Sequence, residues 1–268
     1  KVLSASDRIF LLHLGGKIHV QNKHPLTNRN MLSMVYTPGV GRVSLAIAKD
    51  RALVHLYTTK ANSVAVVTDG SAVLGLGNLG PEAALPVMEG KAMLFREFAG
   101  IDAWPLCLST QDPDEIVRIV QGIAPSFGGI NLEDISAPRC FEIERRLKSA
   151  LDIPVMHDDQ HGTAIISAAA LLNACEIQKK KLEKAKFVVN GAGAAAVACM
   201  NLYVALGAHR ENFLVFDSKG LIHESRTDLD ELKKGLVSHG KIVSLAEGLK
   251  EADIFIGLSK GNVLNSDM

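Results

Sequence analysis

Two pairs of acidic residues stand out as groups that could do chemistry. Glu133-Asp134 and Asp158-Asp159 each follow directly on a short apolar stretch that is predicted to be a β-strand. Ligands of open α/β sheets bind outside the carboxyl ends of the strands, so carboxylates at neighbouring strand ends would converge. Such a group of oxygens suits a hard divalent cation, Mg²⁺ or Mn²⁺. The alternative is that each pair caps the helix that follows it.

Lys91 and Tyr36 are candidates for proton transfer. Apolar residues lie three, four and seven positions from Lys91 on both sides, which places it on the apolar face of a predicted helix. Desolvation there can lower the pKa of a lysine and make it a base; alternatively, its ammonium group extends to the surface. Tyr36 precedes Pro38 and Gly39, which favour a turn, so it either presents its hydroxyl group to a cleft or packs its ring.

A glycine-rich turn and a later acid are typical of a dinucleotide site. The turn follows an apolar predicted strand and leads into a helix whose first amides would face a pyrophosphate. Gly191 would make the turn, Gly193 would let the backbone approach the phosphates, Ala194 would open the helix, and Ala196 would allow close packing. Asp217 ends the next predicted strand, where an acid binds a ribose hydroxyl. The alternative is a packing turn that binds nothing.

A second glycine motif, Gly75-x-Gly77-x-x-Gly80, competes with the first. The helix after it opens with Pro81-Glu82, which puts a negative charge where a pyrophosphate would sit. We therefore interpret this motif as a loop on the substrate side, with a plain glycine turn as the alternative.

Alternating strands and helices have to position these groups. Strands are predicted at residues 64–68, 104–108, 129–132, 155–157, 187–190, 213–216, 242–243 and 253–257. Helices are predicted at about 82–99, 113–123, 139–150, 161–176 and 194–206. This order predicts an α/β fold. An N-terminal α/β substrate domain, residues 1–159, is followed by a Rossmann-type, parallel-sheet nucleotide-binding domain, residues 160–268.

The amino-acid composition and the balance of charges indicate which kinds of partner the protein binds. The chain has 268 residues, 47% hydrophobic and 22% charged, and its 29 basic residues balance 29 acidic ones. We therefore expect neither nucleic-acid nor membrane binding, and no apolar run reaches the ~18 residues of a membrane helix. Four widely spaced cysteines indicate free buried thiols and a cytoplasmic protein. Both ends look trimmed, so organellar targeting stays open.

Six segments, in order, resemble the malic enzyme family, and are nearer to its short microbial form than to its long animal form. They are YTPGV from Tyr36, TDGSAVLGLGNLG from Thr68, PVMEGK ending at Lys91, NLEDI from Asn131, HDDQHGTA from His157 and NGAGAA from Asn190.

The resemblance implies oxidative decarboxylation of L-malate to pyruvate and carbon dioxide, with reduction of NAD or NADP. It assigns the divalent metal to Glu133, Asp134 and Asp159. It makes Lys91 the base and Tyr36 the acid, and it matches Asp158 to the aspartate beside the metal. It also implies a homodimer or a higher homo-oligomer.

Departures from the family pattern matter as well. The long forms have a substrate-binding arginine at the position of Ala72, so another group must bind the malate carboxylate. The family's later Asn-Pro segment is missing, which indicates a C-terminally truncated chain. Asp217 favours NAD because a carboxylate repels a 2′-phosphate, whereas the nearby Lys219 and Arg226 favour NADP.

Two other readings compete with a malic enzyme. The first is a catalytically incomplete regulatory module that binds nucleotide and metal, which the missing segment would explain. The second is an amino-acid dehydrogenase of similar two-domain build. Amino-acid dehydrogenases typically need no metal, so the two acidic pairs disfavour this interpretation.

Overall fold

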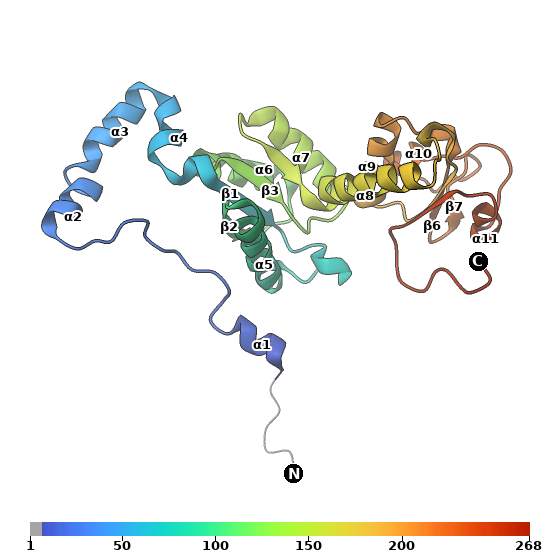
Figure 1. Cartoon of the computed structure of the whole chain (residues 1–268), viewed down its shortest axis with the longest axis horizontal. Coiled ribbons are helices and arrows are strands. Elements are labelled where there is room, and N and C mark those ends of the chain that lie inside the picture. The colour runs from blue at the N-terminus through green and yellow to red at the C-terminus, as the bar shows by residue number, and fades with distance from the viewer. Residues whose placement is uncertain (1–6) are drawn as a thin grey trace, which may run out of the picture. The chain divides into compact units, whose positions relative to one another are not determined.

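The computed structural model describes residues 7–268 and divides the chain into two compact units between Met156 and His157. The sequence predicted domains of residues 1–159 and 160–268. Each unit has its own four-stranded sheet, and Figure 1 follows the chain through both in colour. The predicted α/β fold class is confirmed.

The first sheet has the strand order β2-β1-β3-β4. Its strands are β1 (Ser63–Thr68), β2 (Asp102–Cys107), β3 (Gly129–Leu132) and β4 (Val155–His157). β1 pairs in parallel with both β2 and β3, so their carboxyl ends lie at one edge. The middle of β1 is fully buried, which explains its continuous run of apolar residues.

Three long helices connect these strands. They are α5 (Pro81–Ala99), α6 (Pro113–Ile123) and α7 (Arg139–Ala150). Right-handed crossovers in this strand order put α5 on one face of the sheet and α6 and α7 on the other, as Figure 1 shows. α6 begins where its sequence directs, because the side chain of Asp112 accepts from the backbone N–H of Asp114 and Pro113 opens the first turn.

The segment before the first sheet forms short helices. They are α1 (Arg8–His13), α2 (Arg29–Val35), α3 (Val40–Lys49) and α4 (Val54–Tyr57). Among the described residues, none in these four helices is buried. By length and composition alone, residues 29–49 could cross a membrane, with a mean hydropathy of 1.2, contrary to the expectation that no run is long enough. Pro38 and Gly39 separate this stretch into α2 and α3.

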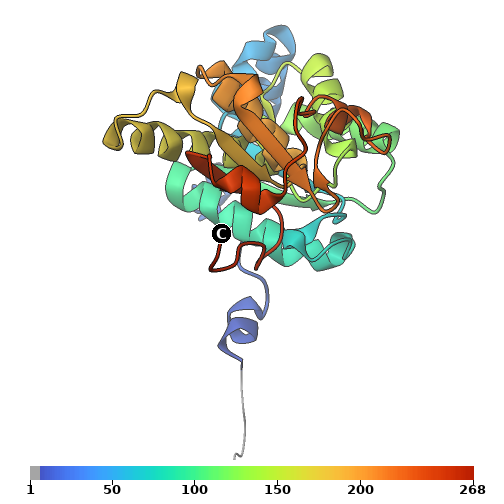
Figure 2. The same ribbon diagram turned by 90° about the vertical axis from the view of Figure 1, so that its right-hand side faces the viewer.

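The second sheet has the strand order β7-β6-β5-β8. Its strands are β5 (Phe187–Asn190), β6 (Phe213–Asp217), β7 (Gly220–Leu221) and β8 (Ile254–Gly257). Its helices are α8 (Asp158–Ile177), α9 (Ala194–Ala205), α10 (Glu231–Lys234) and α11 (Leu245–Leu249). β5 is parallel to β6 and β8, whereas β7 turns back antiparallel to β6. Figure 2 turns this unit, coloured yellow to red, toward the viewer.

Both faces of the second sheet are apolar, because its strands are covered on both sides. Phe187 and Val189 of β5 pack with residues of α8 and α9, whereas Val188 between them packs with residues of α11 on the opposite face. Ring stacking of Phe187 on Phe213, with centroids 4.3 Å apart, joins β5 to β6 on the first of these faces.

Several elements differ from the sequence prediction. The predicted strand at 242–243 is wrong, since Ile242 and Val243 lie in a loop before α11. The short hairpin strand β7 was not predicted. α8 begins at Asp158 rather than at 161, which puts Asp158 and Asp159 in its first turn. The remaining described elements are 3₁₀ turns: η1 (Arg51–Leu53), η2 (Thr59–Asn62), η3 (Val73–Gly75), η4 (Ala124–Ser126), η5 (Leu182–Lys184) and η6 (Arg210–Asn212).

The four cysteines are free, as predicted, and three of them are buried. Cys107 is the exception, since it is only partly buried. Burial, with a contribution from the charge of Glu82, raises the pKa of the Cys107 thiol to about 11, which keeps it protonated near neutral pH.

Candidate functional site

The three predicted metal ligands lie together at the carboxyl edge of the first sheet. Glu133 and Asp134 follow β3 directly, and Asp159 lies two residues beyond the end of the neighbouring β4. One carboxylate oxygen from each lies within 4.8 Å of the others. Glu133 and Asp134 are buried. Buried carboxylates this close repel one another unless positive charge is present, so the three fit a hard divalent cation.

None of these acids is the N-cap residue of the helix that follows it. Within the described part of the chain, neither α7 nor α8 has a side-chain N-cap hydrogen bond, and their N-cap residues are Pro138 and His157. Asp134 instead adopts a positive φ of 52°. Its backbone carbonyl accepts from the N–H of Ala72 at 3.0 Å, and its Oδ1 accepts from the N–H of Leu74 at 3.3 Å. These bonds hold the acid against the loop that follows β1.

Lys91 lies against this carboxylate group. Its Nζ is 3.1 Å from Oε1 of Glu133, and its side chain is 22% exposed. Asn131 donates to the other oxygen, Oε2 of Glu133, at 2.8 Å, which fixes the orientation of that carboxylate. Met88 and Ala92 on the same helix are buried. Lys91 therefore directs its ammonium group to a carboxylate, and the snorkelling alternative is wrong.

Tyr36 lies at the C-terminal end of α2, and 68% of the residue is exposed. Among the described residues, its hydroxyl group has no hydrogen-bond partner, and its ring is not packed in a core. The exposure of Tyr36 argues against the ring-packing alternative. Its role as an acid stays a prediction.

The glycine turn after β5 has the geometry of a phosphate-binding turn. Gly191 has a φ of 127°, and a Cβ there would lie 2.3 Å from the carbonyl oxygen of Leu258, so only glycine fits. Gly193 is the N-cap of α9, and a Cβ there would meet nothing within 4 Å. Ala194 opens the helix and Ala196 is buried. In the described chain no side chain caps α9, so its first N–H groups are available to an anion.

Asp217 lies beside that turn, at the carboxyl end of β6. Its neighbour Phe216 is opposite Asn190, the last residue of β5. Its side chain is 7% exposed and pairs with Arg226 at 2.9 Å and with Lys233 at 2.8 Å. Burial on its own raises the pKa of Asp217, but hydrogen bonds from Arg226 and Lys233 outweigh it and hold that pKa far below its ordinary value. Arg226 was predicted from the sequence to lie near this acid, whereas Lys233 was not.

A buried ion pair that the sequence analysis missed shapes the loop after β1. Asp69 is fully buried and pairs with Arg139, the first residue of α7, at 3.1 Å. A Cβ on Gly70 would lie 2.3 Å from the backbone of Gly80, so the two ends of the loop touch. The intervening glycines of the second motif also have positive φ values and make turns. The acid followed by glycine after a buried strand was the available signal.

Comparison with known proteins covers both units. Residues 15–148 match the family model "Malic enzyme, N-terminal domain", and residues 160–262 match "Malic enzyme, NAD binding domain". An NAD-dependent malic enzyme of Geobacillus stearothermophilus is 53% identical over 277 residues, which cover 98% of this chain and 56% of that protein. An NADP-dependent malic enzyme of Escherichia coli is 48% identical, over 94% of this chain and 34% of that protein.

Solved structures show the same similarity to malic enzymes. The crystal structure of an NAD-dependent malic enzyme from Thermotoga maritima matches with a TM-score of 0.90 and 47% identity, over 97% of this chain and 71% of that one. The chain thus spans about half or less of the two curated relatives named above, and more of this solved one. Because malic enzyme family models match residues in both units, the chain belongs to the malic enzyme family.

Proposed function

We propose that this chain serves the oxidative decarboxylation of L-malate to pyruvate and carbon dioxide, with reduction of NAD or NADP. The observation that carries the proposal is the contact of Lys91 with Glu133, because it joins a proton acceptor to a group of carboxylates that suits a divalent metal. The relatives' names support the reaction, since they are NAD- and NADP-dependent malic enzymes.

Glu133, Asp134 and Asp159 would hold the metal, Mg²⁺ or Mn²⁺. When bound, the metal would polarise the substrate oxygen and the nicotinamide would accept hydride. Asp158 lies next to Asp159 in the first turn of α8, where it would add negative charge beside the metal.

Lys91 would accept the proton of the malate hydroxyl group as hydride leaves the adjacent carbon. For this step Lys91 must be the neutral amine, a form that a cation bound at Glu133 would favour by offsetting the carboxylate charge. The 3.1 Å contact with Glu133 restrains the long side chain and so positions its Nζ. Tyr36 would later protonate carbon as enolpyruvate becomes pyruvate. This last role rests on the family resemblance of the segment that begins at Tyr36.

The test is turnover of L-malate, followed through the absorbance of the reduced nicotinamide, with Mn²⁺ and either NAD or NADP. We expect reduction that stops on addition of EDTA and returns with excess Mn²⁺. Nucleotide binding without turnover would instead favour the regulatory module. Turnover that is insensitive to EDTA would contradict the metal-dependent mechanism.

A further inference from the structure

The carboxylate of Asp217 is saturated with hydrogen bonds. Its Oδ1 accepts from the backbone N–H of Lys219 at 2.9 Å and from Nη1 of Arg226 at 2.9 Å. Its Oδ2 accepts from Nη2 of Arg226 at 3.2 Å and from Nζ of Lys233 at 2.8 Å. A carboxylate offers about four acceptor positions, so none is left for a ribose hydroxyl group.

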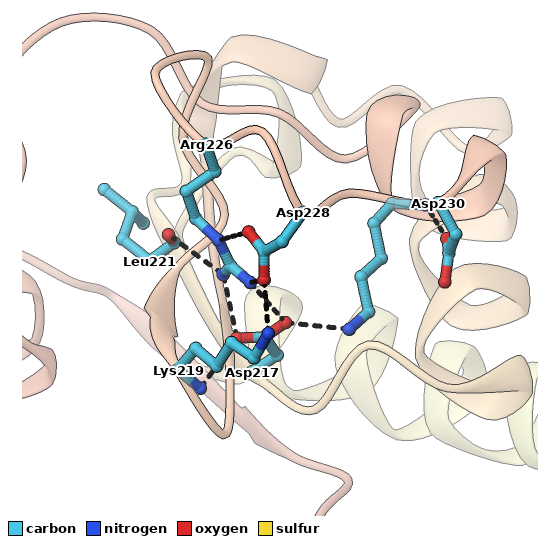
Figure 3. A network of polar contacts seen from close by, with 7 residues as sticks. Asp217, Lys219, Leu221, Arg226, Asp228 and Asp230 are labelled. Atoms are coloured by element: carbon cyan, nitrogen blue, oxygen red, sulfur yellow. Dashed lines mark hydrogen bonds and ion pairs between the residues drawn. The ribbon is translucent and has the colours of Figure 1, made fainter.

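Arg226 is saturated as well. Figure 3 shows its guanidinium group between the carboxylates of Asp217 and Asp228. Beyond its two bonds to Asp217, it donates to both oxygens of Asp228 at 2.9 Å and to the carbonyl of Leu221 at 3.4 Å. All five N–H groups of a guanidinium are then used, so Arg226 neutralises the two acids and has no donor left for a ligand.

Two lysines on the rim of this network retain donor capacity. Nζ of Lys219 is 2.7 Å from Asp228, and Nζ of Lys233 is 2.8 Å from Asp217. An ammonium group has three N–H bonds, so each lysine has two beyond the one given to these carboxylates. Their side chains are 68% and 27% exposed, respectively. With Arg226, three cations surround two carboxylates, and the network has a net charge of +1.

The network lies where a dinucleotide's adenosine ribose is bound in this type of sheet, at the end of β6 beside the turn that starts at Gly191. We propose that it is a 2′-phosphate site, in which Lys219 and Lys233 bind the phosphate. Arg226 is a positioning residue, because it neutralises Asp217 and occupies its oxygens. The chain therefore binds NADP in preference to NAD. This proposal rests on the proposed function, since it names the cofactor of that reaction.

Charge and hydrogen bonding both favour the binding of NADP over that of NAD. The 2′-phosphate carries a charge of about −1.5 to −2 and three acceptor oxygens, which match the free N–H groups of two ammonium ions. The ribose hydroxyl group of NAD lacks this charge and finds the acid that would accept from it already occupied. The expected difference is therefore in affinity for the 2′-substituent, with the pyrophosphate contacts shared by both cofactors.

The test is calorimetric titration of the chain with NADP and with NAD, in the absence of malate. We expect NADP to bind more tightly. Replacing both lysines, Lys219→Ala with Lys233→Ala, should weaken NADP binding about tenfold or more, the size of one charge-assisted hydrogen bond. The same change should not weaken NAD binding, because loss of Lys233 frees one acceptor position of Asp217. Lys186→Ala is the matched control, because Lys186 forms a similar 2.9 Å ion pair with Glu251. Lys186 precedes β5 and so lies at the amino ends of the strands, away from the proposed site.

Replacing Arg226 separates the positioning role from a merely structural one. Arg226→Leu should release Asp217, so that NADP binding weakens while NAD binding strengthens. A general loosening of the loop would weaken both cofactors together. The double variant Arg226→Leu with Asp217→Asn removes the released charge and should lose the gain in NAD binding.

The outcomes separate the two proposals. Failure of both cofactors to bind would overturn the proposed function. NAD binding equal to or tighter than NADP binding, or lysine variants that lower both affinities equally, would overturn the 2′-phosphate site and leave the proposed function in place.

Discussion

At the scale of single residues, the two glycines of the turn after β5 serve different ends. Gly191 is required by the fold, because its positive φ and the nearby Leu258 carbonyl exclude a side chain. Gly193 has an ordinary φ of −87° and open space around it, so the fold does not require glycine there. A dinucleotide that approaches the backbone would explain the absent side chain.

Substitutions of these glycines should therefore separate folding from binding. Gly193→Ala should change the free energy of unfolding by no more than about 0.5 kcal/mol and still weaken nucleotide binding, since the new methyl group stands in the approach path. Gly191→Ala should destabilise the fold by roughly 1–3 kcal/mol. Urea unfolding and nucleotide titration measure the two effects. A Gly193→Ala variant that binds nucleotide normally would argue against the assignment of this turn.

Lys91 and Tyr36 should affect different steps of the reaction. Lys91→Ala should lower malate oxidation about 10²–10⁴-fold, the usual contribution of a general base. Tyr36→Phe should chiefly impair proton delivery to carbon, seen as slower exchange of the methyl protons of pyruvate with solvent. Decarboxylation of oxaloacetate supplies the comparison. Equal losses of oxaloacetate decarboxylation and pyruvate enolisation in both variants would count against this division.

At the scale of elements, the β6–β7 hairpin and the chain that leads to α10 are joined by the ion pairs of Asp217. The pKa of that carboxyl lies far below 3.8, its ordinary value, because the hydrogen bonds from Arg226 and Lys233 outweigh the opposing effect of burial. A lowered folded-state pKa contributes stability above the unfolded value, and that stability is lost as the pH falls toward the folded value.

Replacing Asp217 should therefore reduce the loss of unfolding free energy that occurs as the pH falls into the acid range. In the native chain this contribution is fully present well above pH 3.8 and declines below it. Asp217→Asn should be less stable than the native chain near neutral pH, with the difference shrinking below pH 3.8. Urea unfolding at a series of pH values measures it. A constant difference across that range would show that Asp217 acts by packing and not by charge.

At the scale of the whole molecule, the segment before the first sheet exposes several large apolar residues. Ile9, Phe10 and Leu12 of α1 are exposed, and so is Leu45 of α3. Exposed apolar groups of this size, gathered in a segment whose four helices bury nothing in the described chain, are typical of interaction surfaces. We propose that they pack against a second copy of the chain.

A charged residue in this segment should weaken the assembly. Phe10→Glu should shift the chain toward monomer in analytical ultracentrifugation, because burying a carboxylate at an interface is costly. Arg8→Ala, on the same exposed helix, is the control and should leave the distribution unchanged. A native chain that sediments as a monomer at all accessible concentrations would refute the proposal.

Local features of the amino-acid sequence were sufficient to predict most elements that carry the candidate site. β3, β4 and β5 were predicted residue for residue, as were α6 and α7, because apolar runs, proline at a helix start and glycine turns act within a few neighbours. The strand at residues 242–243 was wrong for the complementary reason. Two apolar residues are strand-like locally, but in the fold Val243 packs beside α11 and has no strand partner among the described residues.

Tertiary structure alone decided which chemical groups meet. Lys91 and Glu133 come from a helix and a strand end, and only the sheet order and the face that α5 covers bring them to 3.1 Å. Asp217 reads as an acid ready for a ribose hydroxyl group until the returning chain places Arg226 and Lys233 on its oxygens. The sequence alone determined the fold class and the residue types at each strand end, since these depend on short-range patterns. Pairing between distant charges depends on how the chain returns, and this no local pattern encodes.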